Sequence, residues 1–250
     1  MSAVPLSEAV AAPAQLSAVA DRRDALSAPD RAAMQTLLDG HFAGVSAEQF
    51  ATDLDEKDWV LRIFAGARLV GFTTLQAYAA SHEGLRVRVL YSGDTIMAPD
   101  AWGSPVLAKG WISLVHRVQA EHPEHPWYWL LLSSGFRTYR FLPVFWREFW
   151  PRHDAATPPE MAALLGALAV ERFGADFEAT AGVVRFARPQ RLRGALVVVP
   201  EGREDDPHIR FFLARNPGHA AGDELVCLAP IHDGNLTAAG VRIVRAARRG

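Results

Sequence analysis

The spacing of apolar positions changes several times along the chain, and each change predicts a different element. From Pro29 to Phe42 apolar residues recur at helical spacing. Ser46, followed three residues later by Gln49, is typical of a capping box and predicts a second, short helix. Beyond this point apolar and polar residues alternate, which predicts three antiparallel strands joined by tight turns, over residues 59–64, 68–75 and 85–91.

A helix and a buried strand follow this meander. Residues 106–119 carry a stripe of apolar side chains at helical spacing. Residues 127–132 form the most apolar strand of the chain, a pattern typical of a strand covered on both faces. A strand–helix–strand connection is a right-handed crossover that makes its two strands parallel. The sequence therefore predicts an α/β fold with a mixed sheet, an antiparallel meander followed by a parallel crossover.

The last hundred residues predict an extension of the same sheet. After an aromatic run over 136–150, interrupted by Pro143, a helix is expected from Pro158 to Phe173. Four more strands are expected over 182–186, 195–199, 209–214 and 224–229. With no internal repeat and no linker, we expect residues 1–28 to be a flexible leader and residues 29–250 to form one domain.

Composition argues against several classes of partner and site. Among 250 residues, 26 basic and 28 acidic side chains are spread along the chain and give a net charge of -2, so we expect neither nucleic acid nor an anionic membrane as a partner. The single cysteine, Cys227, excludes an intrachain disulfide framework and a thiolate zinc site. His122 and His125 lack an evident third ligand, so no metal is expected.

The sequence shows no evident targeting signal. The first twenty residues lack a basic segment and contain Pro5 and Pro13, unlike a signal peptide. No window reaches the length of apolar residues that a membrane span needs. We therefore expect a cytoplasmic protein, and the sequence specifies no oligomeric state.

The order of elements over Trp59–Pro151 resembles that of the GCN5-related N-acetyltransferase superfamily. The resemblance implies that the fourth and fifth strands of the sheet splay apart, and that the open backbone of the fourth binds the pantetheine arm of acyl-CoA. It also implies that the next loop and helix N-terminus bind the coenzyme A pyrophosphate. The residues of this chain at those places are Ile96, Met97, Ala98, Trp102, Gly103, Ser104 and Lys109.

The phosphate-binding loop departs from the superfamily pattern. That pattern has Gln or Arg, then Gly, then Gly or Ala, whereas this chain reads Asp100-Ala101-Trp102-Gly103-Ser104-Pro105, in which only Gly103 fits. Asp100 repels phosphate, Pro105 has no N–H to donate, and Lys109 offers one compensating charge. Either the phosphate site is weakened or the donor is an acyl carrier protein.

The resemblance also assigns chemical roles. Acylation of an amine needs a base for the ammonium proton and an acid for the departing thiolate. In the superfamily a carboxylate on the fourth strand and a tyrosine after the fifth strand often have these two roles. The residues of this chain at those places are Asp94 and Tyr139. The remaining expected substrate contacts are Tyr91, Ser133, Ser134, Arg137 and Trp146.

The expected function is therefore transfer of an acyl group from a pantetheine thioester to an amine of a small molecule or a peptide. The aromatic residues over 128–150 suggest a medium or long acyl group, because they would line a pocket for a long chain. In this the chain resembles N-acyl amino acid synthases and acyl-homoserine lactone synthases. Two alternatives stay open: a non-catalytic acyl- or coenzyme A-binding module, and an autoinducer-type synthase.

Overall fold

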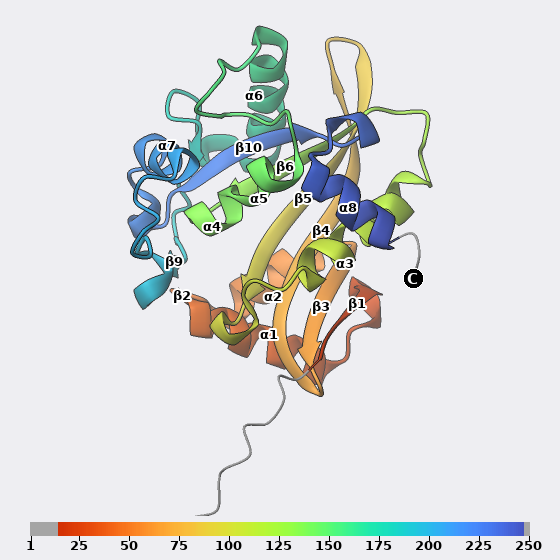
Figure 1. Cartoon of the computed structure of the whole chain (residues 1–250), viewed down its shortest axis with the longest axis vertical. Coiled ribbons are helices and arrows are strands. Elements are labelled where there is room, and N and C mark those ends of the chain that lie inside the picture. Colours follow the sequence, from red (N-terminus) through yellow and green to blue (C-terminus); the bar gives the residue numbers. More distant parts are fainter. Residues whose placement is uncertain (1–14, 248–250) are drawn as a thin grey trace, which may run out of the picture.

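An eight-stranded mixed sheet runs through the computed structural model, which describes residues 15–247 (Figure 1). Its strand order is β1-β3-β4-β5-β6-β10-β8-β7, and only the β5–β6 pair is parallel within the described residues. The strands are β1 Leu16–Arg22, β3 Trp59–Ala65, β4 Arg68–His82, β5 Leu85–Met97, β6 Trp127–Ser133, β7 Phe177–Glu178, β8 Val183–Val184 and β10 Glu224–Pro230. The predicted mixed α/β class, with a meander followed by a parallel crossover, is confirmed.

Helices cover both faces of this sheet. They are α1 Ala28–His41, α2 Ala47–Asp55, α3 Val106–Gln119, α4 Phe136–Tyr139, α5 Phe141–Phe145, α6 Pro159–Phe173, α7 Pro207–Arg215 and α8 Ala238–Ala247. On one face α1 and α2 pack over β3–β5, and α6 packs over β5, β6 and β10. On the other face lies the largest apolar core, which α3, α8 and the short helices after β6 enclose. Side chains on one strand alternate between the faces: Val89 and Tyr91 pack under α6, and Leu90 packs on the α3 side.

The two helix starts predicted near the N-terminus are confirmed by their caps. Ser27 and Asp30 form a reciprocal capping box at the start of α1. Ser46 Oγ accepts a hydrogen bond from the Gln49 N–H at 3.0 Å and begins α2.

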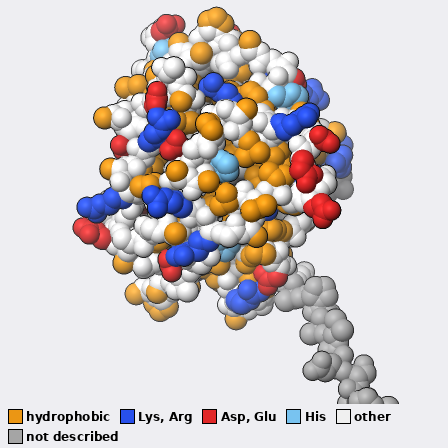
Figure 2. All heavy atoms as spheres, turned by 90° about the vertical axis from the view of Figure 1, so that its left-hand side faces the viewer, with side chains coloured by type: hydrophobic (Ala, Val, Ile, Leu, Met, Phe, Trp, Pro, Cys, Tyr) orange, Lys and Arg blue, Asp and Glu red, His pale blue; other side chains and the backbone are white. Residues whose placement is uncertain are grey.

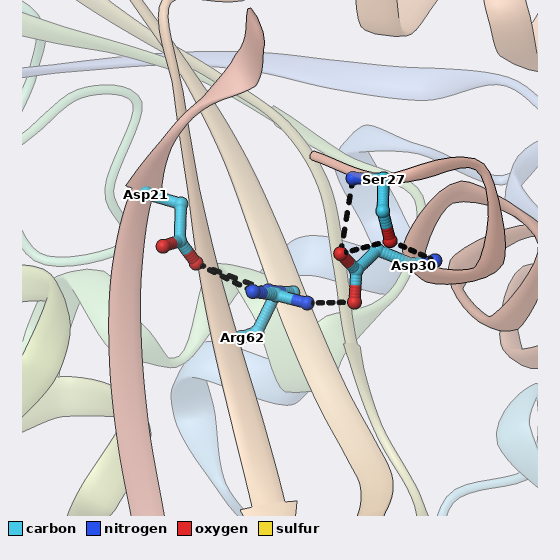
Figure 3. Close-up of polar contacts among 4 residues, drawn as sticks. All are labelled: Asp21, Ser27, Asp30 and Arg62. Atoms are coloured by element: carbon cyan, nitrogen blue, oxygen red, sulfur yellow. Dashed lines mark hydrogen bonds and ion pairs between the residues drawn. The ribbon is translucent and has the colours of Figure 1, made fainter. Parts of the chain in front are cut away.

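The first strand of the sheet was missed by the sequence analysis. The prediction of a flexible leader is wrong from Leu16 onward, because this segment pairs along its whole length with β3; residues 1–14 lie outside the described part of the chain. Arg62 on β3 joins β1 to α1. Its guanidinium donates to Asp21 Oδ2 in β1 at 2.8 Å and also to Asp30 at the start of α1 (Figure 3). The segment is rich in Ala and Ser, which have little preference for strands, so its pattern gave no strand signal.

Two of the strands predicted near the C-terminus are also wrong. Residues 209–214 lie in α7, where the Asp206 side chain accepts from the His208 and Ile209 N–H groups and Pro207 occupies the first turn. Residues 195–199 form a short 3-10 turn and irregular chain. The strand over 224–229 is confirmed as β10, which pairs with β6 and extends the sheet as expected.

Among the residues that the structure describes, no helix has the length and apolar character needed to cross a membrane.

Candidate functional site

Strands β5 and β6 separate at the centre of the sheet. Their parallel pairing runs from Arg88 and Trp127 to Ser92 and Leu131 and ends there. β5 continues to Met97 while staying paired with β4 on its other edge. The edge of residues 93–97 that faces β6 therefore has no strand partner in the described chain, and an extended ligand can pair with it.

A β-bulge interrupts β5 at the point of separation. The register pairs Thr73 with Thr95 but Leu75 with Ser92, so Gly93 and Asp94 together lie opposite the single residue Thr74. A bulge of this kind turns the following side chain away from the regular alternation of the strand. It brings the Asp94 carboxyl to the open edge.

A cavity of about 470 Å³ lies where the strands separate. Its walls come from α2, β5, the loop before α3, α4, the C-terminal end of α6 and the start of β10. The expected site residues that line it are Tyr91, Asp94, Ile96, Met97, Trp102, Gly103, Ser104, Ser134 and Arg137. Most of the predicted donor wall and one of the two predicted catalytic residues therefore meet at a single cavity.

Tyr139 does not line this cavity. It is fully buried, its hydroxyl donates to the Pro151 carbonyl oxygen at 2.9 Å, and its ring packs edge-on against Phe149. Burial raises the pKa of this phenol far above its usual range. The structure thus places the expected acid in the core under α4.

Four other expected contacts lie outside the cavity wall. The Ala98 N–H donates to the Val70 carbonyl oxygen at 2.7 Å, and Ser133 is fully buried at the end of β6. Lys109 is exposed on α3. Trp146 packs in a cluster with Trp111 and Trp129, at ring-centre distances of 5.5 and 4.9 Å.

Carboxyl groups that the sequence analysis did not select also line the cavity. Asp53 and Glu56 come from the region of α2, and Glu224 begins β10. Burial raises the pKa of Asp94 to about 6, against the opposing effect of the Lys57 cation. Burial, with the nearby Asp94 charge, raises the pKa of Glu224 to about 8. The pKa of Asp94 is therefore close to the value that suits a general base at neutral pH.

Two cations flank the Tyr91 ring in the same wall. The Arg172 guanidinium lies 3.8 Å from the ring centre and the Lys57 ammonium 5.4 Å from it. Arg172 also donates to Gln76 Oε1 at 2.6 Å and to Glu56 Oε2 at 3.0 Å. Burial raises the pKa of Tyr91 well above its usual range, so this phenol stays protonated and can donate a hydrogen bond but not act as a base.

The loop before α3 is ordered by contacts that the sequence did not indicate. Asp100 forms an ion pair with Arg68, which offsets the charge that would repel a phosphate. Trp102 donates from Nε1 to the Met97 carbonyl oxygen at 2.8 Å, and His41 Nε2 lies 3.2 Å from the same oxygen. Gly103 has a φ of +81°, a conformation that favours glycine.

We use the term roof segment for residues 190–196, which cross the cavity. Its strand β9 (Arg191–Leu192) pairs with β2 (Phe42–Ala43), and Arg193 donates to the Asp39 and Phe42 carbonyl oxygens at 2.8 and 2.9 Å. At the other end Arg137 donates to the Leu196 carbonyl oxygen at 2.7 Å. This side of the molecule, at the left of Figure 1, is drawn in Figure 2, where basic and acidic side chains are interspersed with apolar ones.

No group of three or more His, Cys, Asp or Glu side chains in residues 15–247 could hold a metal ion.

Comparisons with known proteins bear on the fold. No family model and no curated protein matches the chain. Similar solved structures include a conserved Enterococcus faecalis V583 protein described as a probable N-acyltransferase, with 9% identity over 88% of this chain and 67% of that one, at a TM-score of 0.42.

Two further solved structures carry acyltransferase descriptions. An acyl-CoA N-acyltransferase from Pseudomonas aeruginosa shares 16% identity over 46% of this chain and 79% of its own, at a TM-score of 0.34. The Escherichia coli GNAT family N-acetyltransferase YhbS, solved with CoA, shares 14% identity over 48% of this chain and 64% of its own, at a TM-score of 0.35.

Proposed function

We propose that this protein is an N-acyltransferase that moves an acyl group from a pantetheine thioester to an amine. The proposal rests mainly on the position of Asp94. This carboxyl group, with a pKa of about 6, lies on the bulge where β5 ends its pairing with β6, and it lines the cavity. An acceptor amine beside Asp94 would lose its proton to the carboxylate and attack the thioester carbonyl. The acceptor is a small molecule or a peptide amine.

The open edge of β5 supports binding of the donor. Pantetheine carries two amide groups in an extended chain, and residues 93–97 have no strand partner on the side facing β6, although the Met97 carbonyl oxygen accepts from Trp102 Nε1. Such binding adds a short strand to the sheet and requires no particular side chain. Either acyl-CoA or an acyl carrier protein thioester meets this requirement.

We propose that the acyl group enters the tryptophan cluster, which limits its length. Only about 20 Å³ is open among Trp111, Trp129 and Trp146, which is room for about one water-sized group. The medium or long chain expected from the aromatic run does not fit there in this conformation. We therefore propose a short acyl group, and a comparison of acetyl, octanoyl and palmitoyl donors on one amine tests it; faster transfer of palmitoyl would contradict it.

The central test is release of thiol from acetyl-CoA in the presence of a panel of amines, with wild type and Asp94→Asn. The amide keeps the shape of the carboxylate but cannot accept the proton, so we expect turnover to fall by about 10²-fold or more. Glu121→Gln, an exposed change at the end of α3, is the matched control. Equal turnover of Asp94→Asn and wild type would reject the assignment.

A non-catalytic acyl- or coenzyme A-binding module is the second candidate. It is favoured by the loop before α3, in which only Gly103 fits the superfamily pattern and Pro105 has no N–H to donate. The two functions differ in one result. A binding module shows a thermal shift with acetyl-CoA and releases no thiol with any amine, whereas an enzyme releases it.

A further inference from the structure

Lys57 is a buried lysine in the wall of the cavity. The chain has 26 basic residues, of which Lys57 and Lys109 are the only lysines. Lys109 is exposed on α3, whereas Lys57, just after α2, is 6% exposed and lines the cavity. A chain that otherwise uses arginine thus has an amine at its most enclosed basic position.

The Lys57 side chain extends over the bulge that carries Asp94. A Cβ built at Gly93 would lie 2.9 Å from Lys57 Cε and 3.7 Å from Nζ. Nζ donates to the Asp53 main-chain oxygen at 2.7 Å, so this hydrogen bond goes to a carbonyl rather than to a carboxylate. The amine therefore lies beside the open edge of β5, next to the group that we assign as the base.

The surroundings of Lys57 increase the fraction of its amine that is neutral. Burial lowers the pKa of Lys57, the Arg172 cation lowers it further, and Asp94, Asp53 and Glu56 act in the opposite direction. A neutral amine is nucleophilic, whereas an arginine here would stay charged and would not react.

We propose that Lys57 is itself an acyl acceptor, so that the protein acylates its own cavity lysine when no free amine occupies the site. The inference rests on the proposed function, because it takes the same thioester donor. The Lys57 nitrogen attacks the thioester carbonyl, the C–N bond forms and the C–S bond breaks. Asp94 receives the proton of the amine and passes it to the departing thiolate, which leaves as the free thiol.

Self-acylation of Lys57 changes the site that performs it. The product is a neutral amide, so the cation that opposes the raised pKa of Asp94 is removed. The pKa of Asp94 then rises, and a smaller fraction of this carboxyl group is ionised at neutral pH. Acylated protein transfers acyl groups to added amines more slowly than unmodified protein.

The test incubates the full chain with acetyl-CoA and no added amine, followed by intact mass measurement and peptide mapping. We expect one acetyl group per chain, on Lys57, with Lys109 largely unmodified. Spontaneous acetylation would instead favour the exposed Lys109, which makes it an internal control. Label on Lys109 alone, or on neither lysine while added amines are acetylated, overturns the inference and leaves the proposed function intact.

Variants and a second reagent separate the remaining outcomes. Lys57→Arg keeps the charge and is expected to lose the label, and Asp94→Asn is expected to acquire it more slowly. Acetic anhydride, which needs no pantetheine site, is expected to modify Lys57 at a lower pH than Lys109. If no amine is acetylated from acetyl-CoA the proposed function fails, and if acetic anhydride modifies Lys109 first at every pH the inference about Lys57 also fails.

Discussion

At the scale of single residues, the site depends on carboxyl groups that burial keeps partly protonated. Asp94 and Glu224 have pKa values of about 6 and about 8, above their ordinary values of 3.8 and 4.5. Folding therefore favours their neutral forms. Ionising them in the cavity costs stability that an acceptor carrying a positive charge would restore.

The first prediction concerns this cost. Because their folded pKa values are raised, the two groups contribute stability that is fully present below pH 3.8 and is lost as pH rises through about 6 for Asp94 and about 8 for Glu224. Glu224→Gln should therefore flatten the decline in unfolding free energy between about pH 5 and 8, measured by urea denaturation. Parallel curves for wild type and variant would show that Glu224 ionises freely in the folded state.

The second prediction concerns Tyr139, the expected acid. Tyr139→Phe removes a buried hydrogen bond to the Pro151 carbonyl, so we expect a loss of about 1 kcal/mol in stability and little change in turnover. Thermal unfolding and thiol release measured on the same preparation check both parts. A turnover loss near 10²-fold with unchanged stability would restore Tyr139 as the acid.

At the scale of elements, the bulge in β5 does the most to build the site. The Gly93 position is crowded, since an added Cβ would lie 2.7 Å from Thr74 Oγ1 and 2.9 Å from Lys57 Cε. One of these neighbours has to move when a side chain is added. Both of them lie beside Asp94.

The third prediction uses this crowding. Gly93→Ala should displace the Thr74 or Lys57 side chain in the cavity wall and reduce turnover by about 10²-fold, because small misplacements of groups around a catalytic residue have effects of this size. Gly166→Ala in α6 is the matched control: its Cβ meets nothing within 4 Å, and it should raise stability by about 0.5–1 kcal/mol at unchanged turnover. Turnover of Gly93→Ala equal to that of the control would show that the bulge tolerates a side chain.

The elements that could be predicted from the sequence are those with strong local signals. The caps at Ser27 and Ser46, the alternating residues of β3 and β5 and the apolar run of β6 each identify an element within a few residues. β1 has no such signal of its own. It is stabilised by hydrogen bonds to its partner β3 and by the ion pair with Arg62, and both come from another segment of the chain.

The residues of the site, like the elements, could be predicted only where the local sequence carries a signal. Asp94 could be placed because it lies in the strand to which the resemblance assigns the donor. Asp53, Arg172 and Glu224 come from segments distant in the sequence, and only the folded chain brings them together. The low number of lysines in the sequence was the one local signal for Lys57.

At the scale of the whole molecule, one continuous sheet joins the N-terminal and C-terminal parts. It runs from β1 through the β5–β6 pair to β10, and the apolar core on its α3 face receives residues from both parts. A boundary inside the chain would have to cut this sheet. The single domain expected from the sequence remains a prediction.

The fourth prediction follows from that continuity. We expect one cooperative unfolding transition, with coincident curves from far-UV circular dichroism and from tryptophan fluorescence. The seven tryptophans include the buried cluster of Trp111, Trp129 and Trp146, which reports on the centre of the fold. Two separate transitions would show that the C-terminal hundred residues fold as a unit of their own.

The wall and the roof of the cavity come from distant parts of the chain. Arg193 in the roof segment reaches back to Asp39, 154 positions earlier, and Glu224 joins the wall later still. During synthesis the N-terminal strands and helices emerge first, and contacts between distant positions form late because they close long loops. A growing chain therefore has the open edge of β5 well before it has an enclosed site. The enclosed cavity that we propose for acyl transfer forms only after residues 190–224 have been synthesised.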